Sequence, residues 1–225
     1  MKKTLRRTAA AVLIAAGALG FAGTAHASPA NLCDQIDANG MCQFHASGVF
    51  DDIDMVFPSN YPDQQAVTGY LDGILGHYQA DSGLTDARTS PHALEVTSTR
   101  YSTAHTQSVV LDVYQNTGGA HPMEWYRAFN YNTATEQPLT FDMVFNGDAH
   151  PAQTLLPLVQ AELGRQFGQP VDIAADTGLD VSNYHNFALT DDEVIFFFDK
   201  NQLVPATPAT QVSVPRSAIQ GLLKP

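Results

Sequence analysis

The sequence has few basic residues, and this shortage excludes one class of function. It contains 11 Lys and Arg against 23 Asp and Glu, which gives a formal net charge of −12. A field of this sign repels nucleic acid and anionic lipid surfaces, so we expect no nucleic-acid partner. It favours a basic partner; the alternative is that the acidity only keeps the protein soluble.

Long apolar runs are also missing, except for one near the N-terminus. The first 27 residues hold four basic residues, then an apolar stretch at 9–21 and an A-x-A pattern at 25–27. This order predicts a signal peptide at 1–27, and the stretch is too short for a membrane span. General secretion is favoured, while Arg6 and Arg7 leave twin-arginine export open. Cleavage would leave 7 basic and 23 acidic residues, a net charge of −16.

Cysteine is nearly absent. Cys33 and Cys42 are the only two, and they lie close together behind the predicted signal peptide. In an exported chain such a pair predicts one structural disulfide that closes a short loop. A redox-active pair would more typically have C-x-x-C spacing.

The remaining chain has alternating and helical patterns. Alternation predicts strands from residue 49 onward and again from residue 94, and the apolar block at 194–198 has the length of a buried strand. Helical spacing follows Pro62, with apolar positions at Val67, Tyr70, Leu71, Ile74, Leu75 and Tyr78. These patterns predict an α+β fold with antiparallel or mixed twisted sheets and helices packed on one side.

The sequence also predicts where a second helix begins and where the chain divides into subdomains. The second helix is predicted with Thr154 as its N-cap and Pro157 in its first turn. The polar segment 79–91 is the predicted subdomain boundary. It divides the chain into an N-terminal subdomain at 28–90 with the disulfide loop and a C-terminal subdomain at 91–225.

Known catalytic and metal-binding motifs are missing as well. The chain has no G-x-S-x-G, S-x-x-K, H-E-x-x-H, P-loop or G-x-G-x-x-G motif. Asp51, Asp52 and Asp54 form an acidic cluster, but on an alternating strand they cannot all face one ion. We therefore predict no metal and no cofactor.

One segment suggests a site. In "TGGAHPMEW", Gly118 and Gly119 can adopt positive φ and expose N–H groups to an anion. His121 could then act as a general base for a neighbouring hydroxyl, and it is the one candidate catalytic residue. The alternative is a glycine turn between two strands, with Trp125 packing on the sheet. Gly118, Gly119, His121 and Trp125 are the candidate binding residues.

Several blocks, in order, resemble a known family: "YPDQQ", "VVLDVYQNTGGAHP", "VSNYHNFALTDDEVIFFF" and "TQVSVPRSAI". The whole mature chain is similar to the secreted immunogenic antigens of mycobacteria. The half from about residue 94 is similar to the extracytoplasmic domain of RsiV-type anti-sigma factors, which bind lysozyme. The resemblance implies an α+β protein with grasp-like sheets.

Two functions follow from this resemblance. The first is a secreted, immunogenic, non-enzymatic binding module for a basic protein such as lysozyme or for a host protein. The second is a weak carboxylic-ester hydrolase on short acyl chains, because some relatives have been assigned such an activity at the cell wall. No catalytic serine can be transferred to this chain. We expect an extracellular monomer, free or associated with the cell wall.

Overall fold

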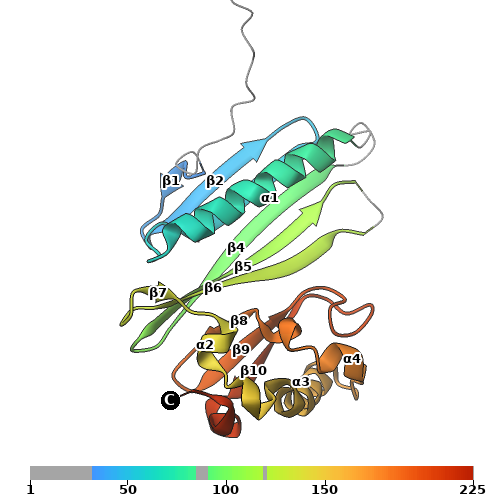
Figure 1. Cartoon of the computed structure of the whole chain (residues 1–225). Coiled ribbons are helices and arrows are strands. Elements are labelled where there is room, and N and C mark those ends of the chain that lie inside the picture. The colour runs from blue at the N-terminus through green and yellow to red at the C-terminus, as the bar shows by residue number, and fades with distance from the viewer. Residues whose placement is uncertain (1–31, 85–90, 119–120, 225) are drawn as a thin grey trace, which may run out of the picture.

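Two sheets of unequal size build the protein. The computed structural model describes residues 32–84, 91–118 and 121–224, so the predicted signal peptide lies outside the described residues. Figure 1 shows the larger sheet above and the smaller sheet, with most of the short helices, below. The α+β fold with a mixed sheet is confirmed. Among the described residues, no helix is long and apolar enough to cross a membrane.

The large sheet has seven strands in the order of the sequence. Neighbouring strands are antiparallel except β3 and β4, which are parallel. The strands are β1 (Gln35–Ile36), β2 (Met41–Ser47), β3 (Asp51–Pro58), β4 (His92–Ser102), β5 (Thr106–Asn116), β6 (Met123–Asn132) and β7 (Gln137–Pro138). The predicted boundary at residue 90 falls between β3 and β4, and the division into subdomains there stays a prediction.

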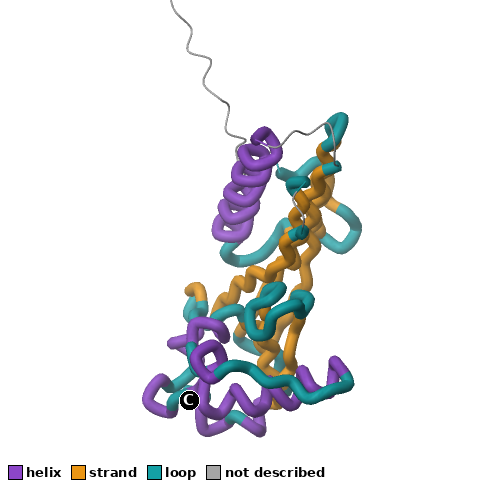
Figure 2. The backbone as a smooth tube through the Cα atoms, turned by 90° about the vertical axis from the view of Figure 1, so that its right-hand side faces the viewer, coloured by secondary structure: helices purple, strands orange, loops and turns teal. Residues whose placement is uncertain are grey.

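Helix α1 (Gln64–Leu84) connects the two parallel strands, as a parallel connection requires. Its first turn is capped by Asp63, whose Oδ1 accepts from the N–H of Ala66 at 3.3 Å. In Figure 2, α1 lies on one side of the large sheet. The helix extends six residues beyond Tyr78, into the segment predicted to be polar and turn-rich, because its interior glycines do not break it once its apolar face is buried.

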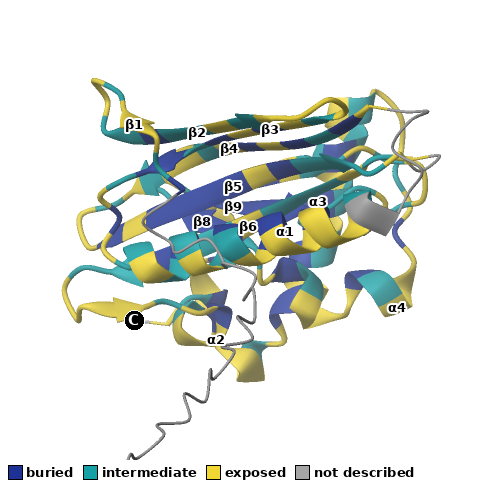
Figure 3. Ribbon diagram, turned by 90° about the horizontal axis from the view of Figure 1, so that it is seen from above, coloured by how far each residue is buried: buried dark blue, intermediate teal, exposed yellow. Residues whose placement is uncertain are grey.

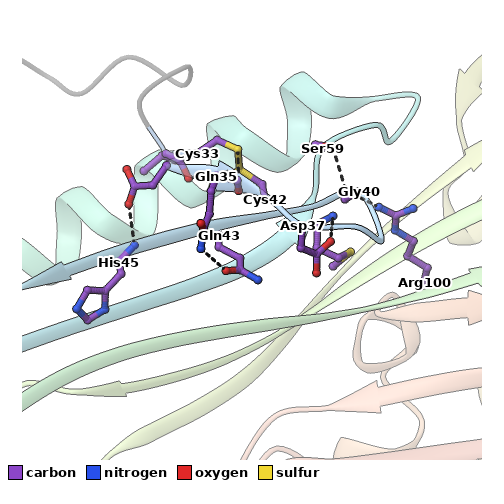
Figure 4. The surroundings of a disulfide bond; sticks show 12 residues. Cys33, Gln35, Asp37, Gly40, Cys42, Gln43, His45, Ser59 and Arg100 are labelled. Carbon is purple, nitrogen blue, oxygen red and sulfur yellow. Dashed lines mark hydrogen bonds between the residues drawn. A yellow bond between two sulfur atoms is a disulfide. The ribbon is translucent and has the colours of Figure 1, made fainter.

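The face of the sheet under α1 holds the first core. The helix side chains predicted to be apolar are buried there, except Tyr70, which is partly buried. They pack on alternate residues of the strands, namely Ile53, Met55, Phe57, Leu94, Val96, Val109, Leu111 and Val113. Cys42 lies in the same core, and its predicted disulfide with Cys33 is confirmed (Figure 4).

The small sheet is antiparallel and consists of β8 (Phe187–Leu189), β9 (Glu193–Phe198) and β10 (Thr210–Pro215) in the order β10-β9-β8. Strand β9 was predicted to be buried, and both of its faces are covered. Ile195 and Phe197 pack with Val110 of β5, on the face of the large sheet opposite α1. Phe196 faces the second core, which lies under α3. Figure 3 shows the buried residues along β5.

Helix α3 (Pro151–Phe167) closes the second core with Leu155, Val159 and Leu163. It begins earlier than predicted, because His150 adopts a left-handed conformation at φ 49° and Pro151 fits the first helical position. Thr154 is therefore not the N-cap. Pro157 lies inside the helix rather than in its first turn. Two shorter helices, α2 (Phe141–Val144) and α4 (Ala175–Gly178), complete this part.

Backbone groups at the edge of β6 form hydrogen bonds with side chains instead of with a full neighbouring strand. Asp199 Oδ1 accepts from the N–H of Tyr126 at 2.8 Å. Asn186 accepts from Ala128 at 3.0 Å and donates to the carbonyl of Tyr126 at 2.9 Å. These bonds attach the C-terminal part of the chain to the large sheet and protect an edge that could otherwise pair with another chain.

Candidate functional site

The turn between β5 and β6 contains the residues that the sequence singled out. Gly118 has φ 80°, which glycine adopts without strain, and its N–H donates to Asn116 Oδ1 at 3.0 Å. That N–H is therefore used within the turn. Gly119 lies outside the described residues, so an anion site at the two glycines stays a prediction.

His121 is exposed and lines a cavity of about 1020 Å³, together with Trp125 and residues 199–201. None of the described residues that line this cavity has a hydroxyl or thiol side chain. A general base needs its proton donor within hydrogen-bonding reach. The catalytic role of His121 stays a prediction, and the described part of the cavity offers it no nucleophile.

Trp125 joins β6 to α1. Its Nε1 donates to the hydroxyl oxygen of Tyr70 at 2.7 Å. Beside it, the guanidinium of Arg127 lies over the rings of Tyr70 and Phe129, at 5.5 and 5.4 Å from their centroids. These contacts hold α1 on the sheet. Trp125 is only partly buried, so a binding role for its exposed part stays a prediction.

A second cavity, of about 690 Å³, lies between β6 and the C-terminal part. Ser182 and His185 both line it, and Asp180 is their neighbour in sequence. The sequence analysis missed this group, although the spacing D-x-S-x-x-H was visible. The hydroxyl of Ser182 donates to Asp180 Oδ1 at 2.7 Å, and the pKa of Asp180 is lowered, chiefly by this bond. A catalytic triad would instead have the serine donate to the histidine.

The face of the large sheet opposite α1 is acidic where the small sheet does not cover it. Strand register aligns one row across five strands: His45, Asp54, Glu95, Tyr114 and Glu124. Asp52 and Asp112 lie on the same face, on β3 and β5. We call Asp52, Asp54, Glu95, Asp112 and Glu124 the acidic face.

Almost no positive charge balances the acidic face. The described strands β2–β6 place no Lys or Arg on it; Arg100 and Arg127 contact the α1 side. Lys200 reaches it from a turn and pairs with Glu124 at 2.9 Å. Partial desolvation, aided by the charge of Glu124, raises the pKa of Asp112. Asp112 and Glu124 therefore repel each other.

One end of this row contains a possible metal-ligand set. His45 Nδ1 lies 2.8 Å from Asp54 Oδ1 and 4.0 Å from Asp52 Oδ1. The three donor atoms lie within 4.8 Å of one another. The hydrogen bond with Asp54 is the main cause of the raised pKa of His45. Asp51 points to the other side of β3, where it accepts from the Tyr78 hydroxyl at 3.3 Å, so the three aspartates do not share one ion.

Known proteins with a similar fold belong to one described family. Residues 142–217 match a family described as "Protein of unknown function (DUF3298)". A DUF3298 protein of Bacteroides fragilis superimposes with a TM-score of 0.58, covering 82% of this chain and 92% of that chain. One from Pseudomonas aeruginosa gives a TM-score of 0.54 over 86% and 97%. Both are 16% identical to this chain, so they show the fold alone.

Mycobacterial relatives are much more similar in sequence. The protein named Esterase Rv3036c of Mycobacterium tuberculosis is 44% identical, over 95% of this chain and 97% of its own length. The Immunogenic proteins MPT64 of the same species and MPB64 of Mycobacterium bovis are 41% identical, over 89% of this chain and 92% of theirs. The resemblance to the mycobacterial antigens is confirmed, and the chain belongs to the family of MPT64, MPB64 and Rv3036c.

Proposed function

We propose that the protein is an exported, immunogenic, non-enzymatic binding module whose acidic face binds a basic protein. The observation that supports this function most directly is the group of four exposed carboxylates, Asp52, Asp54, Glu95 and Asp112, on the face of the large sheet opposite α1. A surface with charge of one sign raises the encounter rate with an oppositely charged partner.

Export of this module is supported by the predicted signal peptide and by the disulfide, which persists in oxidising compartments. The immunogenic proteins among the relatives support an extracellular location, and association with the cell wall stays a prediction. A basic protein such as lysozyme matches the charge of the acidic face. Binding by this face requires no cofactor.

Equilibrium binding to lysozyme tests the proposal. The triple variant Asp54→Asn, Glu95→Gln, Asp112→Asn removes three charges from the acidic face. We expect it to weaken binding roughly tenfold at low salt and to reduce the salt dependence, since both arise from the same charges. The assay contains a chelator, so that a metal ion does not affect the result.

A matched variant separates the acidic face from total charge. Asp148→Asn, Asp172→Asn and Asp191→Asn remove the same three charges from exposed positions outside the acidic face. We expect this variant to bind as the wild type does. Equal loss in both triple variants would contradict a role for this face, and so would binding that does not weaken as salt rises.

Ester hydrolysis is the second candidate, favoured by the relative named as an esterase. The second cavity holds a hydroxyl, an imidazole and, next to them, a carboxylate, in Ser182, His185 and Asp180. For catalysis the Ser182 hydroxyl would have to turn from Asp180 toward His185. His185 would take the hydroxyl proton as the Ser182 oxygen attacks the ester carbonyl, and would give it to the alcohol that leaves when the ester C–O bond breaks; water would then release the acid from Ser182.

Turnover of short-chain nitrophenyl esters tests this candidate. We expect Ser182→Ala to abolish any enzymatic rate if the second cavity is the active site, while His121→Ala keeps it. Loss of the rate in His121→Ala and not in Ser182→Ala would instead indicate an active site at the turn between β5 and β6. If neither the wild type nor the variants exceed the rate without protein, the esterase function is wrong for this chain. Circular dichroism checks that each variant is folded.

A further inference from the structure

We propose that His45, Asp52 and Asp54 bind a divalent transition-metal ion of the zinc type at the edge of the acidic face. The sequence predicted no metal because its three neighbouring aspartates alternate across the strand. In the structure, His45 of the adjacent strand lies beside Asp52 and Asp54, whereas Asp51 lies on the other face. No pattern within β3 could reveal this neighbour.

Strand pairing brings the three ligands together. His45 on β2 lies directly opposite Asp54 on β3, and Asp52 is two residues away on the same face. The imidazole points away from α1 (Figure 4). All three side chains are more than half exposed, with exposed fractions of 55–61%, so a hydrated ion can reach them. Strands hold the backbone of such a set more rigidly than loops do.

The spacing of the donor atoms suits one ion. Bonds of about 2.0–2.2 Å from zinc to nitrogen or oxygen place tetrahedral ligand atoms about 3.3 Å apart. The distances from His45 Nδ1 to the Asp54 and Asp52 oxygens, 2.8 and 4.0 Å, lie on either side of this value. All three side chains are exposed, so they are free to rotate toward a common ion. The metal ion would then replace the proton that His45 Nδ1 and Asp54 share.

The charge around the three ligands also favours a dication. Asp34 lies beside His45, because its Oδ2 accepts from the His45 N–H at 3.0 Å. Glu95 is next to Asp54 across the parallel pair. Among the described residues, no Lys or Arg forms an ion pair with any of these four carboxylates. A dication would relieve their mutual repulsion.

The donor types select the class of ion. An imidazole nitrogen with two carboxylate oxygens suits zinc and its neighbours in the first transition row, whereas magnesium and calcium prefer oxygen ligands only. Three protein ligands also leave a coordination position open, which water or a side chain of another molecule can fill. The site lies within the acidic face, so a bound ion would lower the negative charge there. It does not depend on the proposed function.

Calorimetric titration of the protein, purified without a histidine tag, tests the site. We expect ZnCl₂ to bind with a stoichiometry of one, and MgCl₂ and CaCl₂ to bind far more weakly. His45→Gln and Asp54→Asn should each weaken zinc binding roughly tenfold or more, since each removes a ligand. The controls His105→Gln and Asp148→Asn change exposed residues of the same types elsewhere and should bind zinc as the wild type does.

Backbone amide NMR gives the location independently of affinity. Zinc should shift the signals of residues 34, 45, 52 and 54 in the wild type and shift them much less in His45→Gln at the same zinc concentration. Equal affinity in wild type and His45→Gln would overturn the proposal, as would equal affinity for zinc and magnesium or shifts confined to other histidines. Lysozyme binding in chelator is measured separately, so failure here leaves the proposed function standing.

Discussion

The two faces of the large sheet have opposite chemistry although they share the same strands. On β4, Leu94 is fully buried under α1, while Glu95, the next residue, is exposed on the acidic face. Because side chains alternate along a strand, one short segment serves both purposes. The α1 face stabilises the fold through apolar burial, and the acidic face contributes repulsion. We therefore expect stability to depend mainly on the α1 face and the proposed binding to depend mainly on the acidic face.

The largest expected effect tests this separation at neighbouring residues. Leu94→Ala creates a cavity under α1 and should lower the free energy of unfolding by about 2–5 kcal/mol. Glu95→Gln, one position along, should change it by less than about 0.5 kcal/mol. Urea unfolding followed by circular dichroism measures both. Similar losses in the two variants would show that the two faces do not differ as described.

The disulfide stabilises the α1 side of the sheet, and its removal should give the second largest loss of stability. Replacing Cys33 and Cys42 by alanine should cost roughly 2.5–3 kcal/mol, because the cross-link restricts a loop of about ten residues in the unfolded chain. Urea unfolding of the double variant, and of the wild type with and without reductant, measures this. An unchanged unfolding midpoint after complete reduction would contradict the assignment.

The bond between Trp125 and Tyr70 links β6 to α1 and should contribute less. Trp125→Phe and Tyr70→Phe each remove one partner of this hydrogen bond. A double-mutant cycle should give a coupling of about 1 kcal/mol. Zero coupling would mean that packing alone holds this corner of α1. Circular dichroism is the probe, because Trp125 is the only tryptophan.

The smallest expected effect is a gain in stability, and it comes from a residue of the acidic face. The folded state raises the pKa of Asp112, so folding disfavours its ionised form. The contribution of this carboxyl to stability is therefore fully present below its unfolded pKa of about 4 and is lost as pH rises through the raised folded pKa. Asp112→Asn should therefore stabilise by a few tenths of a kcal/mol at pH 7 and not at pH 3.

A matched variant makes the Asp112 prediction specific. Asp191→Asn removes the same charge from an exposed turn outside the acidic face. Urea unfolding of both variants at pH 3 and pH 7 should show the pH-dependent gain only for Asp112→Asn. An equal gain in both would assign the effect to total charge.

Several elements of the fold were predictable because their signals are local. The apolar positions of α1 and the alternation of β4–β6 depend on residues within a few positions of one another. The predicted start of α3 was wrong, because His150 adopts a left-handed conformation that its residue type does not indicate. The candidate residues near Gly118 were found from one short glycine-containing segment, and their functional roles stay predictions. Ser182 was missed because the spacing D-x-S-x-x-H, although visible, matches none of the catalytic motifs that were searched for.

Local pattern in the sequence was sufficient for the α+β class, the disulfide and the apolar face of α1, because each depends on short-range periodicity or on a close pair of residues. The tertiary structure decided which strands are neighbours. The parallel pairing of β3 with β4 places Asp54 beside Glu95, and the register of β2 places His45 opposite Asp54. Such pairings arise from burial of distant strands against α1, so neither the acidic face nor the possible metal site is visible along the chain.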